Sequence, residues 1–200
     1  MLSYGHGKSF NFELHCSTLN YSQYRMNLYL RLLWTLLRSW RASRLALGDT
    51  LERRLRVLPN DLDINGHMNN GRYLTVVDLM LVEYFVRSGF ARTMLKNGWR
   101  PMAGGSFISY RRGLKPFQTY LLRFRIDAGD AHWNYMRFEF VRKGQVCAAG
   151  YMKGAAVARA GLVPNAESYA AMGLVAPQAA LPAAVRDWLA AEHGVINAAW

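Results

Sequence analysis

The longest apolar stretch of the chain, residues 71–88, has the period of a helix. Its apolar side chains recur three and four positions apart and cover most sides of the helix that they would form. The rest of the domain has to enclose such a helix, because water would otherwise contact apolar surface all around it. We therefore predict a central helix that ends at Ser88-Gly89, followed by a shorter amphipathic piece over residues 91–96.

Segments with the pattern of strands flank this helix on both sides. One alternating segment precedes the helix, at residues 51–58, and ends at Pro59. The extended segments after the helix are residues 101–112, 117–127, 131–142 and 145–159. A long helix wrapped by a curved antiparallel sheet satisfies both patterns. The expected fold class is therefore α+β, in the hotdog arrangement, over residues 50–162.

A second helical pattern, with two distinct faces, lies ahead of this domain. Residues 26–48 are expected to form an amphipathic helix, and residues 27–43 carry the pattern most clearly. One face combines Leu28, Leu32, Leu33, Leu36, Leu37 and Trp40, and the residues opposite them are Arg31, Thr35 and Arg38. The pattern fits a helix in peripheral contact with a membrane interface, and equally one that docks on its own domain or on another subunit.

The two ends of the chain are expected to be less regular. Residues 1–25 have no sustained period, which predicts an irregular extension, and either Met1 or Met26 is the start codon. Residues 163–200 are expected to form an Ala- and Pro-rich tail with a short helix near residues 182–192. The first apolar block begins too late for a signal peptide and contains arginines that argue against a membrane-spanning helix. We therefore expect a cytoplasmic protein, with a peripheral position at the membrane surface as the alternative.

The chain is strongly basic, which narrows the choice of partners. It has 25 Lys and Arg residues against 13 Asp and Glu residues, and its formal net charge is +12. Such a charge favours anionic partners, which include nucleic acid, an anionic membrane and a phosphate-bearing metabolite. No nucleic-acid-binding motif accompanies the charge, so nucleic acid is not an expected partner. Cys16 and Cys147 form neither a CxxC pair nor a His/Cys cluster, so we expect two ordinary thiols and no metal site.

A run rich in polar residues, Asp61-Leu-Asp-Ile-Asn-Gly-His-Met-Asn-Asn70, connects the first strand to the central helix. Its polar side chains cannot all be buried, which predicts a structured loop. With its flanking residues 56–74, this motif resembles the signature of the 4-hydroxybenzoyl-CoA thioesterase-like hotdog proteins. In that signature a strand ends in Asp-x-Asp, Gly-His-x-Asn-Asn follows, and a Tyr begins the central helix. The resemblance covers roughly residues 50–160, and within the superfamily it points to the thioesterase superfamily member 6-like group.

The resemblance implies an acyl thioesterase that hydrolyses acyl-CoA or acyl-carrier-protein thioesters to the free carboxylic acid and the thiol, without a cofactor. Such a reaction needs a nucleophile, or a base that activates water, and a group that holds the developing oxyanion. Asp63 matches the family's catalytic carboxylate. The N-terminus of the central helix is expected to hold the oxyanion, because its first backbone N–H groups are unpaired and carry a partial positive charge.

Other residues of the motif are expected to assist Asp63 or to shape the loop. Asp-x-Asn-x-His resembles the corresponding segment of plant acyl-carrier-protein thioesterases, which implies that His67 orients the carboxylate or relays a proton and that Asn65 holds water or the thioester. A hydrogen bond that fixes the loop explains His67 equally well. Asp61 is expected to fix the loop or pair with an arginine, and Asn69 is expected to cap the helix.

The substrate is expected to lie between this loop and a basic hairpin. Gly66 allows close approach of the backbone, and Asn70 and Tyr73 stand at the start of the helix, where Asn70 is also expected to help fix the loop. Coenzyme A and the carrier-protein arm both present phosphates. A cluster of basic residues at one predicted hairpin is the candidate site for them, and it consists of Arg111, Arg112 and Lys115.

Two carboxylates on the central helix, Asp78 and Glu83, are expected to be ion-paired structural residues, and Asp78 is the reserve candidate for the catalytic carboxylate. The arginines of the later strands are expected on solvated faces, and they are Arg123, Arg125 and Arg137.

Two other functions are compatible with a hotdog domain. A hotdog hydratase has a signature with a Pro and one more residue between Asn and His, whereas Gly66 alone separates Asn65 from His67, which argues against a hydratase. The second alternative is a non-catalytic acyl-binding or membrane-associated hotdog protein, attached to a bilayer through residues 27–43. A single hotdog domain leaves sheet edges open, and the family resemblance implies a homodimer or a dimer of dimers with sites between protomers.

Overall fold

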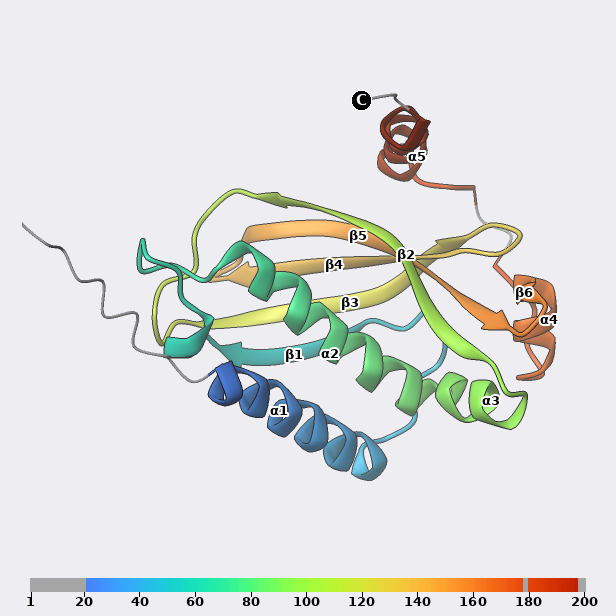
Figure 1. The fold of residues 1–200 in the computed structure, drawn as a ribbon, viewed down its shortest axis with the longest axis horizontal. Coiled ribbons are helices and arrows are strands. Elements are labelled where there is room, and N and C mark those ends of the chain that lie inside the picture. Colours follow the sequence, from blue (N-terminus) through green and yellow to red (C-terminus); the bar gives the residue numbers. More distant parts are fainter. Residues whose placement is uncertain (1–20, 178–179, 198–200) are drawn as a thin grey trace, which may run out of the picture.

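One antiparallel sheet curls around a single long helix in the computed structural model, which describes residues 21–177 and 180–197 (Figure 1). The helix is α2 (Asn70–Ser88). The strands are β1 (Leu51–Arg56), β2 (Arg100–Tyr110), β3 (Thr119–Gly129), β4 (Asn134–Arg142), β5 (Gln145–Ala158) and β6 (Gly161–Leu162). They pair in the order β1-β3-β4-β5-β2, and β6 adds to β5. This confirms the predicted α+β hotdog fold.

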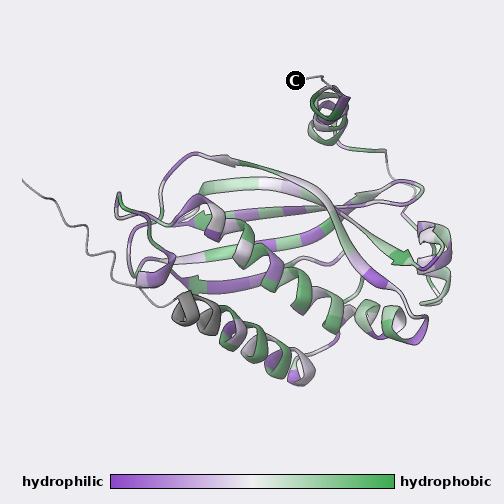
Figure 2. Ribbon diagram, in the orientation of Figure 1, coloured by the Kyte–Doolittle hydropathy of each residue, from purple (hydrophilic) through white to green (hydrophobic). Residues whose placement is uncertain are grey.

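The main core lies between α2 and the inner face of the sheet. Val77 and Tyr84 of α2 are fully buried there, and the Tyr84 ring meets the ring of Phe124 of β3 with 5.5 Å between centroids. Successive residues of a strand face opposite sides, and Figure 2 shows the resulting change between hydrophobic and hydrophilic residues along the strands. Burying each of these large side chains contributes roughly 1.5–3 kcal/mol, so this inner face is the main source of stability.

Three short helices complete the fold: α3 (Phe90–Lys96), α4 (Asn165–Ala170) and α5 (Ala183–Asn197). The sequence pattern predicts α3 closely, but it does not predict α4 or β6. Helix α4 depends on contacts between distant residues, because the Asn165 side chain donates to the carbonyls of Asp130 and Trp133 at 2.9 and 3.0 Å. No local period reveals such contacts.

Helix α5 docks on the sheet and extends beyond the short helix expected near residues 182–192. Val185 is fully buried in a cluster that is separate from the core around α2, and the Trp188 ring meets that of Phe107 with 5.2 Å between centroids. Lys153 of β5 forms an ion pair with Glu192. The Lys153 ammonium also lies over the Trp188 ring, 5.6 Å from its centroid, which adds a cation–π contact. The C-terminal segment is therefore attached to the sheet through defined contacts.

Helix α1 (Tyr21–Arg41) lies beside β1 and α2 (Figure 1). It begins before residue 26 and ends well before residue 48, which corrects both expected limits. Residues 1–20, with Cys16, lie outside the described residues. After Arg41 the backbone forms hydrogen bonds with Arg87, at the end of α2, in place of further helical ones. The Arg87 guanidinium donates to the Ser43 carbonyl at 2.9 Å, and the Leu45 N–H donates to the Arg87 carbonyl at 3.2 Å.

Helix α1 docks on the domain through its polar side, a choice that the sequence pattern left open. Arg31 and Thr35 fall opposite the leucines in the helical pattern, yet they face the domain, and Ser39 on the same side is buried. Leu32 and Leu36 are half-buried, whereas the other large apolar residues between Leu28 and Trp40 face solvent. Among the exposed residues are Leu30 (61%), Leu33 (54%), Trp34 (67%) and Trp40 (74%). Among the described helices, none is long and apolar enough to span a membrane.

The reason for this orientation is an ion pair between α1 and the motif. The Arg31 guanidinium donates two hydrogen bonds to the Asp61 carboxylate, at 3.0 and 2.9 Å. The same carboxylate accepts from the Leu58 N–H at 3.0 Å, and only 2% of the Asp61 side chain is exposed. A buried carboxylate needs such partners, so Arg31 has to face inward. This confirms the expectation that Asp61 fixes the loop and pairs with an arginine.

We predict that Arg31→Gln lowers the free energy of unfolding by about 1–3 kcal/mol, because it leaves a buried carboxylate without its charged partner. Urea denaturation followed by circular dichroism measures the change. The matched control is Arg41→Gln, which removes an exposed charge from the same helix and should change the stability by no more than about 0.5 kcal/mol. Equal losses in the two variants would contradict a stabilising role for the ion pair.

Candidate active site

The motif between β1 and α2 forms a closed loop held by backbone hydrogen bonds. A short 3-10 helix, η1 (Pro59–Asp61), begins it, and Leu62 and Met68 then pair across the loop in an isolated β-bridge. The Asn69 N–H donates to the Asp61 carbonyl at 2.8 Å. The Met68 N–H donates to the carbonyl of Leu114, at 2.7 Å, in the connection between β2 and β3. The motif loop is therefore rigidly attached to that connection.

Asp63 stands where the tight turn of this loop begins, directly after the bridge, and organises the turn with one carboxylate oxygen. Its Oδ1 accepts from the N–H of Asn65 at 2.8 Å and from the N–H of His67 at 3.2 Å. Its own N–H donates to the His67 carbonyl at 2.8 Å. Gly66 completes the turn with a φ of 71°, a conformation that favours glycine. The Asp63 side chain is half-buried, and its Oδ2 has no hydrogen-bond partner among the described residues.

The structure brings Asn65 and His67 to Asp63 through their backbones. The Asn65 side chain is exposed at the surface of the loop. The His67 ring packs against Gly113 of the β2–β3 connection, where a Cβ atom would lie only 2.8 Å from His67 Cδ2. The imidazole therefore lies at the junction between the motif loop and the basic connection, and its backbone N–H rather than its ring contacts the carboxylate.

The N-terminus of α2 stands next to this loop. As expected, Asn69 caps the helix, and its Oδ1 accepts from the Gly71 N–H at 2.9 Å. The Asn70 carbonyl accepts from the Tyr110 hydroxyl at 2.9 Å, which connects β2 to the first turn of the helix. No acceptor of the described residues takes the Asn70 N–H. One backbone donor at the positive end of α2 is therefore available to an incoming group.

Tyr73 is enclosed behind this helix end. Only 1% of the residue is exposed, and its hydroxyl accepts from the Leu114 N–H at 3.4 Å. Its ring lies 5.1 Å from that of Tyr110 and 4.8 Å from that of Phe140, centroid to centroid. Burial raises the pKa of Tyr73, and nearby groups that include Asp63 add to the shift. Tyr73 thus supports the β2–β3 connection from behind.

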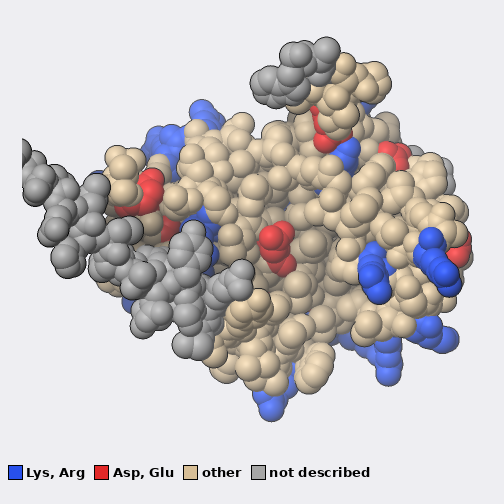
Figure 3. Space-filling view, in the orientation of Figure 1, with Lys and Arg blue, Asp and Glu red and all other residues tan. Residues whose placement is uncertain are grey.

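The basic residues expected to meet phosphates lie on that same connection. Arg111, Arg112 and Lys115 are all exposed. The N–H groups of Arg111 and Arg112 donate to the Cys147 carbonyl at 2.8 and 3.1 Å, and the Arg112 guanidinium contacts Gln145. Because Leu114 bonds to the motif loop, the structure places these cations beside it. Figure 3 shows basic and acidic side chains together at the end of the molecule where this loop lies in Figure 1.

Other charged groups have separate roles. Glu83 is buried and forms ion pairs with Arg53 and Arg87, as expected. Asp78 was expected to be ion-paired, but it has no cation within ion-pair distance among the described residues; it lies at the surface of α2, and partial loss of hydration raises its pKa. The strand arginines are half-exposed and paired with nearby carboxylates, as a solvated face requires; they are Arg123, Arg125 and Arg137.

Sequence reasoning missed one residue that shapes the site, Arg31. The sequence does contain a pattern that indicates an inward-facing Arg31. Arg31, Thr35 and Ser39 are spaced four apart and form a narrow polar seam in a helix rich in leucine. In the described part of the chain, no three His, Cys, Asp or Glu side chains are grouped so that they could hold a metal ion.

Comparison with known proteins connects this geometry to a family. A model of the thioesterase-like superfamily matches residues 57–190. Protein THEM6 of Xenopus laevis is 39% identical over 85 residues, which cover 42% of this chain and 41% of that protein. Protein THEM6 of Danio rerio is 33% identical over 118 residues, 58% of this chain and 57% of that protein. Thioesterase poxG of Penicillium oxalicum is 28% identical over 98 residues, 42% and 32% of the two chains. The chain thus spans about half the length of these curated relatives, or less.

Solved structures share the fold at low identity. The probable thioesterase YbaW of Escherichia coli has a TM-score of 0.56 and 16% identity, over 61% of this chain and 98% of that one. A gentisyl-coenzyme A thioesterase has a TM-score of 0.52 and 17% identity, over 59% and 95%. A Staphylococcus aureus protein solved in complex with CoA has a TM-score of 0.54 and 12% identity, over 72% and 96%.

The family model covers more than half of the chain and includes the motif loop, α2 and strands β2 to β6. The shared fold and the motif agree with it. This chain therefore belongs to the thioesterase-like superfamily of hotdog proteins.

Proposed function

We propose that this chain is an acyl thioesterase that hydrolyses acyl-CoA or acyl-carrier-protein thioesters. The observation that carries the proposal is the arrangement of Asp63. The loop holds its carboxylate through Oδ1, while Oδ2 has no partner among the described residues. A carboxylate that is held in place but keeps one oxygen without a hydrogen-bond donor can accept a proton through that oxygen. Membership of the superfamily and the thioesterases among the relatives support this reaction class.

In the proposed reaction Asp63 acts as a general base. Water attacks the carbonyl carbon of the thioester while Asp63 takes one of its protons. The carbonyl oxygen becomes an oxyanion, which the Asn70 N–H and the positive end of α2 stabilise. The C–S bond then breaks, the sulfur takes the electron pair and a proton, and the products are a carboxylic acid and a thiol. Each thioester consumes one water molecule.

Asn65 and His67 have supporting roles in this proposal. The exposed Asn65 amide is suited to orient the attacking water above the loop. The His67 ring, packed on Gly113, stands between Asp63 and the basic connection, where it would relay a proton toward the leaving sulfur. Gly66 leaves open space at the loop tip, since a Cβ there would meet no atom within 4 Å. Tyr73 positions Leu114 and holds the two loops together.

The basic connection would bind the phosphates of the substrate. Arg111, Arg112 and Lys115 reach solvent beside the motif loop, as phosphate ligands must. Coenzyme A and the phosphopantetheine arm both carry phosphate, so this feature fits either carrier. A structural relative solved with CoA supports a CoA thioester as the substrate class.

We propose a homodimer, or a dimer of dimers, as the assembly. Strand β2 pairs only with β5 in the described sheet, so its other edge has unpaired backbone groups (Figure 1). Most of its residues are exposed, and Met102 is 39% exposed. An open edge of this length invites pairing with a second copy.

A peripheral contact with a membrane is the second proposal, and the exposed face of α1 favours it. Trp34 and Trp40 reach solvent together with several leucines, while the polar seam of the helix faces the domain. Exposed Trp and Leu residues next to arginines are typical of helices that lie in a bilayer interface. The same surface would also serve a non-catalytic hotdog protein attached to a membrane.

We predict that Asp63→Asn lowers kcat for acyl-CoA hydrolysis by at least about 100-fold. The amide oxygen still accepts from the Asn65 and His67 N–H groups, so the midpoint of thermal unfolding should change little. A panel of acyl-CoAs of different length measures the activity. The control is Asp78→Asn, the same change on the surface of α2, which should retain activity. Loss in Asp78→Asn and retention in Asp63→Asn would move the catalytic carboxylate to α2.

We predict that the double variant Arg111→Gln/Lys115→Gln raises KM for acyl-CoA by about tenfold, because two cations no longer meet phosphate. KM for the matching acyl-pantetheine, which has no phosphate, should not change. Lys96→Gln, an exposed lysine of α3, is the control for net charge. An equal rise in KM for both substrates would argue against phosphate binding at this connection.

We predict that static light scattering gives at least twice the mass of one chain. Met102→Lys, which places a charge on the exposed edge strand, should shift the population toward the monomer. Leu95→Lys, at an 82% exposed position of α3, is the control and should leave the mass unchanged. A monomeric wild-type chain would contradict the proposed assembly.

We predict that Trp34→Ser/Trp40→Ser reduces partitioning of the chain onto vesicles of anionic lipid, measured by co-sedimentation. The control is Val195→Ser/Ile196→Ser, which removes exposed apolar residues from α5 and should have no effect. If the tryptophan variant partitions like wild type, this face of α1 serves another contact.

A further inference from the structure

A pocket of about 300 Å³ lies between α1, β1 and α2, apart from the motif loop. Its size falls at the lower end of the range for small-molecule sites. Asp63, Asn65 and His67 do not line it. The pocket exists because α1 docks on the domain through its polar seam, so it depends on the segment ahead of the hotdog domain.

The floor and one wall of the pocket are apolar. Val76, Leu79 and Met80 of α2 form the floor, and Leu55 of β1 and Trp34 of α1 add to the walls. Val76 and Met80 also belong to the main core, so the pocket reaches the surface of that core. An alkyl chain would be stabilised on such a floor, because its apolar surface would be removed from water. A purely hydrophilic anion has no apolar surface to bury there.

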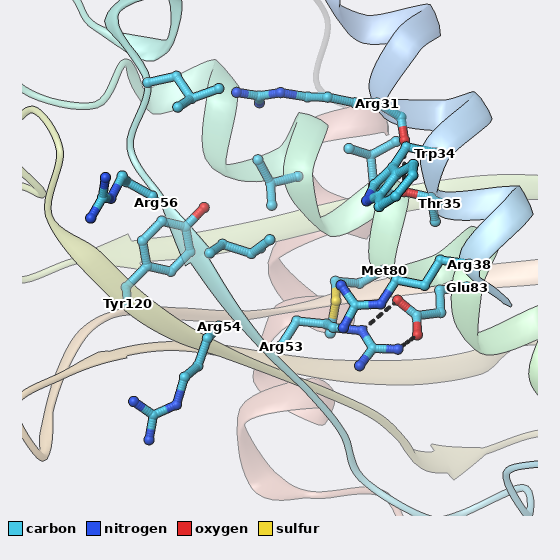
Figure 4. A pocket seen from close by; sticks show the side chains of 14 residues that line it. Arg31, Trp34, Thr35, Arg38, Arg53, Arg54, Arg56, Met80, Glu83 and Tyr120 are labelled. Carbon is cyan, nitrogen blue, oxygen red and sulfur yellow. Dashed lines mark hydrogen bonds and ion pairs between the residues drawn. The ribbon is translucent and has the colours of Figure 1, made fainter. Parts of the chain in front are cut away.

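The rim of the pocket is strongly basic. Five arginines line it, two from α1 and three from β1, and Glu83 is the only lining carboxylate. Figure 4 shows Arg38 of α1 and Arg53 of β1 close to Glu83, with Arg54 and Arg56 on the other side of the opening. Arg31 and Arg53 already have carboxylate partners, Asp61 and Glu83.

Three of the five arginines, Arg38, Arg54 and Arg56, have no carboxylate of the described residues within ion-pair distance. Of these, Arg38 is the one that lies close to Arg53 and Glu83 (Figure 4). The positive charge of Arg38 acts on Arg53, which lies beside it. Burial, followed by repulsion from Arg38 and Arg87, lowers the pKa of Arg53 to about 10. An anion in the pocket would relieve this repulsion.

We infer that this pocket binds a single-chain anionic amphiphile, with its alkyl chain on the α2 floor and its carboxylate or phosphate head on Arg38. An apolar floor under a rim with an unpaired guanidinium matches both the apolar chain and the charged head of such a molecule. A fatty acid and an alkyl phosphate share this chemistry. The inference does not rest on the proposed hydrolysis, because a chain with no thioesterase activity would bind the same ligand.

Decanoate, decyl phosphate and decyltrimethylammonium, each below the concentration at which it forms micelles, are the probes. Isothermal titration calorimetry on the full chain should show binding of one or both anions and much weaker binding of the cation. The relative affinities of the two anions identify the preferred head group. Equal binding of all three probes, or no binding of either anion to the wild-type chain, would overturn the inference.

Two variants locate the site. Arg38→Gln should weaken binding of the anions by about tenfold, the loss expected for one charge-assisted hydrogen bond at a partly exposed position. Arg41→Gln removes the same charge from the same helix without touching the pocket and should stay within about twofold. Leu79→Trp should block the pocket and abolish binding.

The active site is the competing location, since a fatty acid is also the product of the proposed reaction. If decanoate binds in the pocket, Asp63→Asn, whose change lies outside it, should bind decanoate as tightly as wild type, whereas a changed affinity in Asp63→Asn would assign the ligand to the active site. Binding that is unchanged in Arg38→Gln and Leu79→Trp would assign the ligand to another place and refute the inference.

Discussion

The ion pair between Arg31 and Asp61 sets the geometry on which the rest of the site depends. Asp61 begins the motif loop, and the fold buries its carboxylate where water cannot solvate it. A charge in such a position is tolerated only with a charged partner and further hydrogen bonds, and here Arg31 and the Leu58 N–H provide them. Because the partner comes from a helix outside the hotdog domain, the first turn of the motif and the position of α1 are determined together.

Two surfaces follow from that arrangement. With Arg31 turned inward, the helix presents Trp34, Trp40 and several leucines to solvent, which is the surface proposed to meet a membrane. The same orientation leaves the basic pocket between α1, β1 and α2. The pocket opens beside the exposed face, since Trp34 belongs to both (Figure 4). An amphiphile that leaves a bilayer would therefore meet the pocket without crossing much water.

The proposed catalytic site is built differently, from backbone contacts rather than from side-chain pairs. Asp63 uses one oxygen to close its own turn, so the loop remains intact when that residue becomes Asn. The β2–β3 connection is joined to the loop by Met68 and Tyr73, which bond to the two backbone groups of Leu114. This places a carboxylate, a helix N-terminus and a cluster of cations along one end of the domain, an order that suits a substrate with an acyl group and a phosphate.

The sequence by itself determined the order of the elements that form the hotdog fold, the motif loop and the capping of α2 by Asn69, because periodicity and local hydrogen bonds depend on near neighbours. Only the tertiary structure decided which arginine pairs with Asp61, which face of α1 is buried, that Asp78 has no ion pair and that His67 meets Asp63 through its backbone. These depend on residues that are far apart in the chain, such as Arg31 and Asp61, and a buried charge there outweighed the preference of an apolar face for the protein interior.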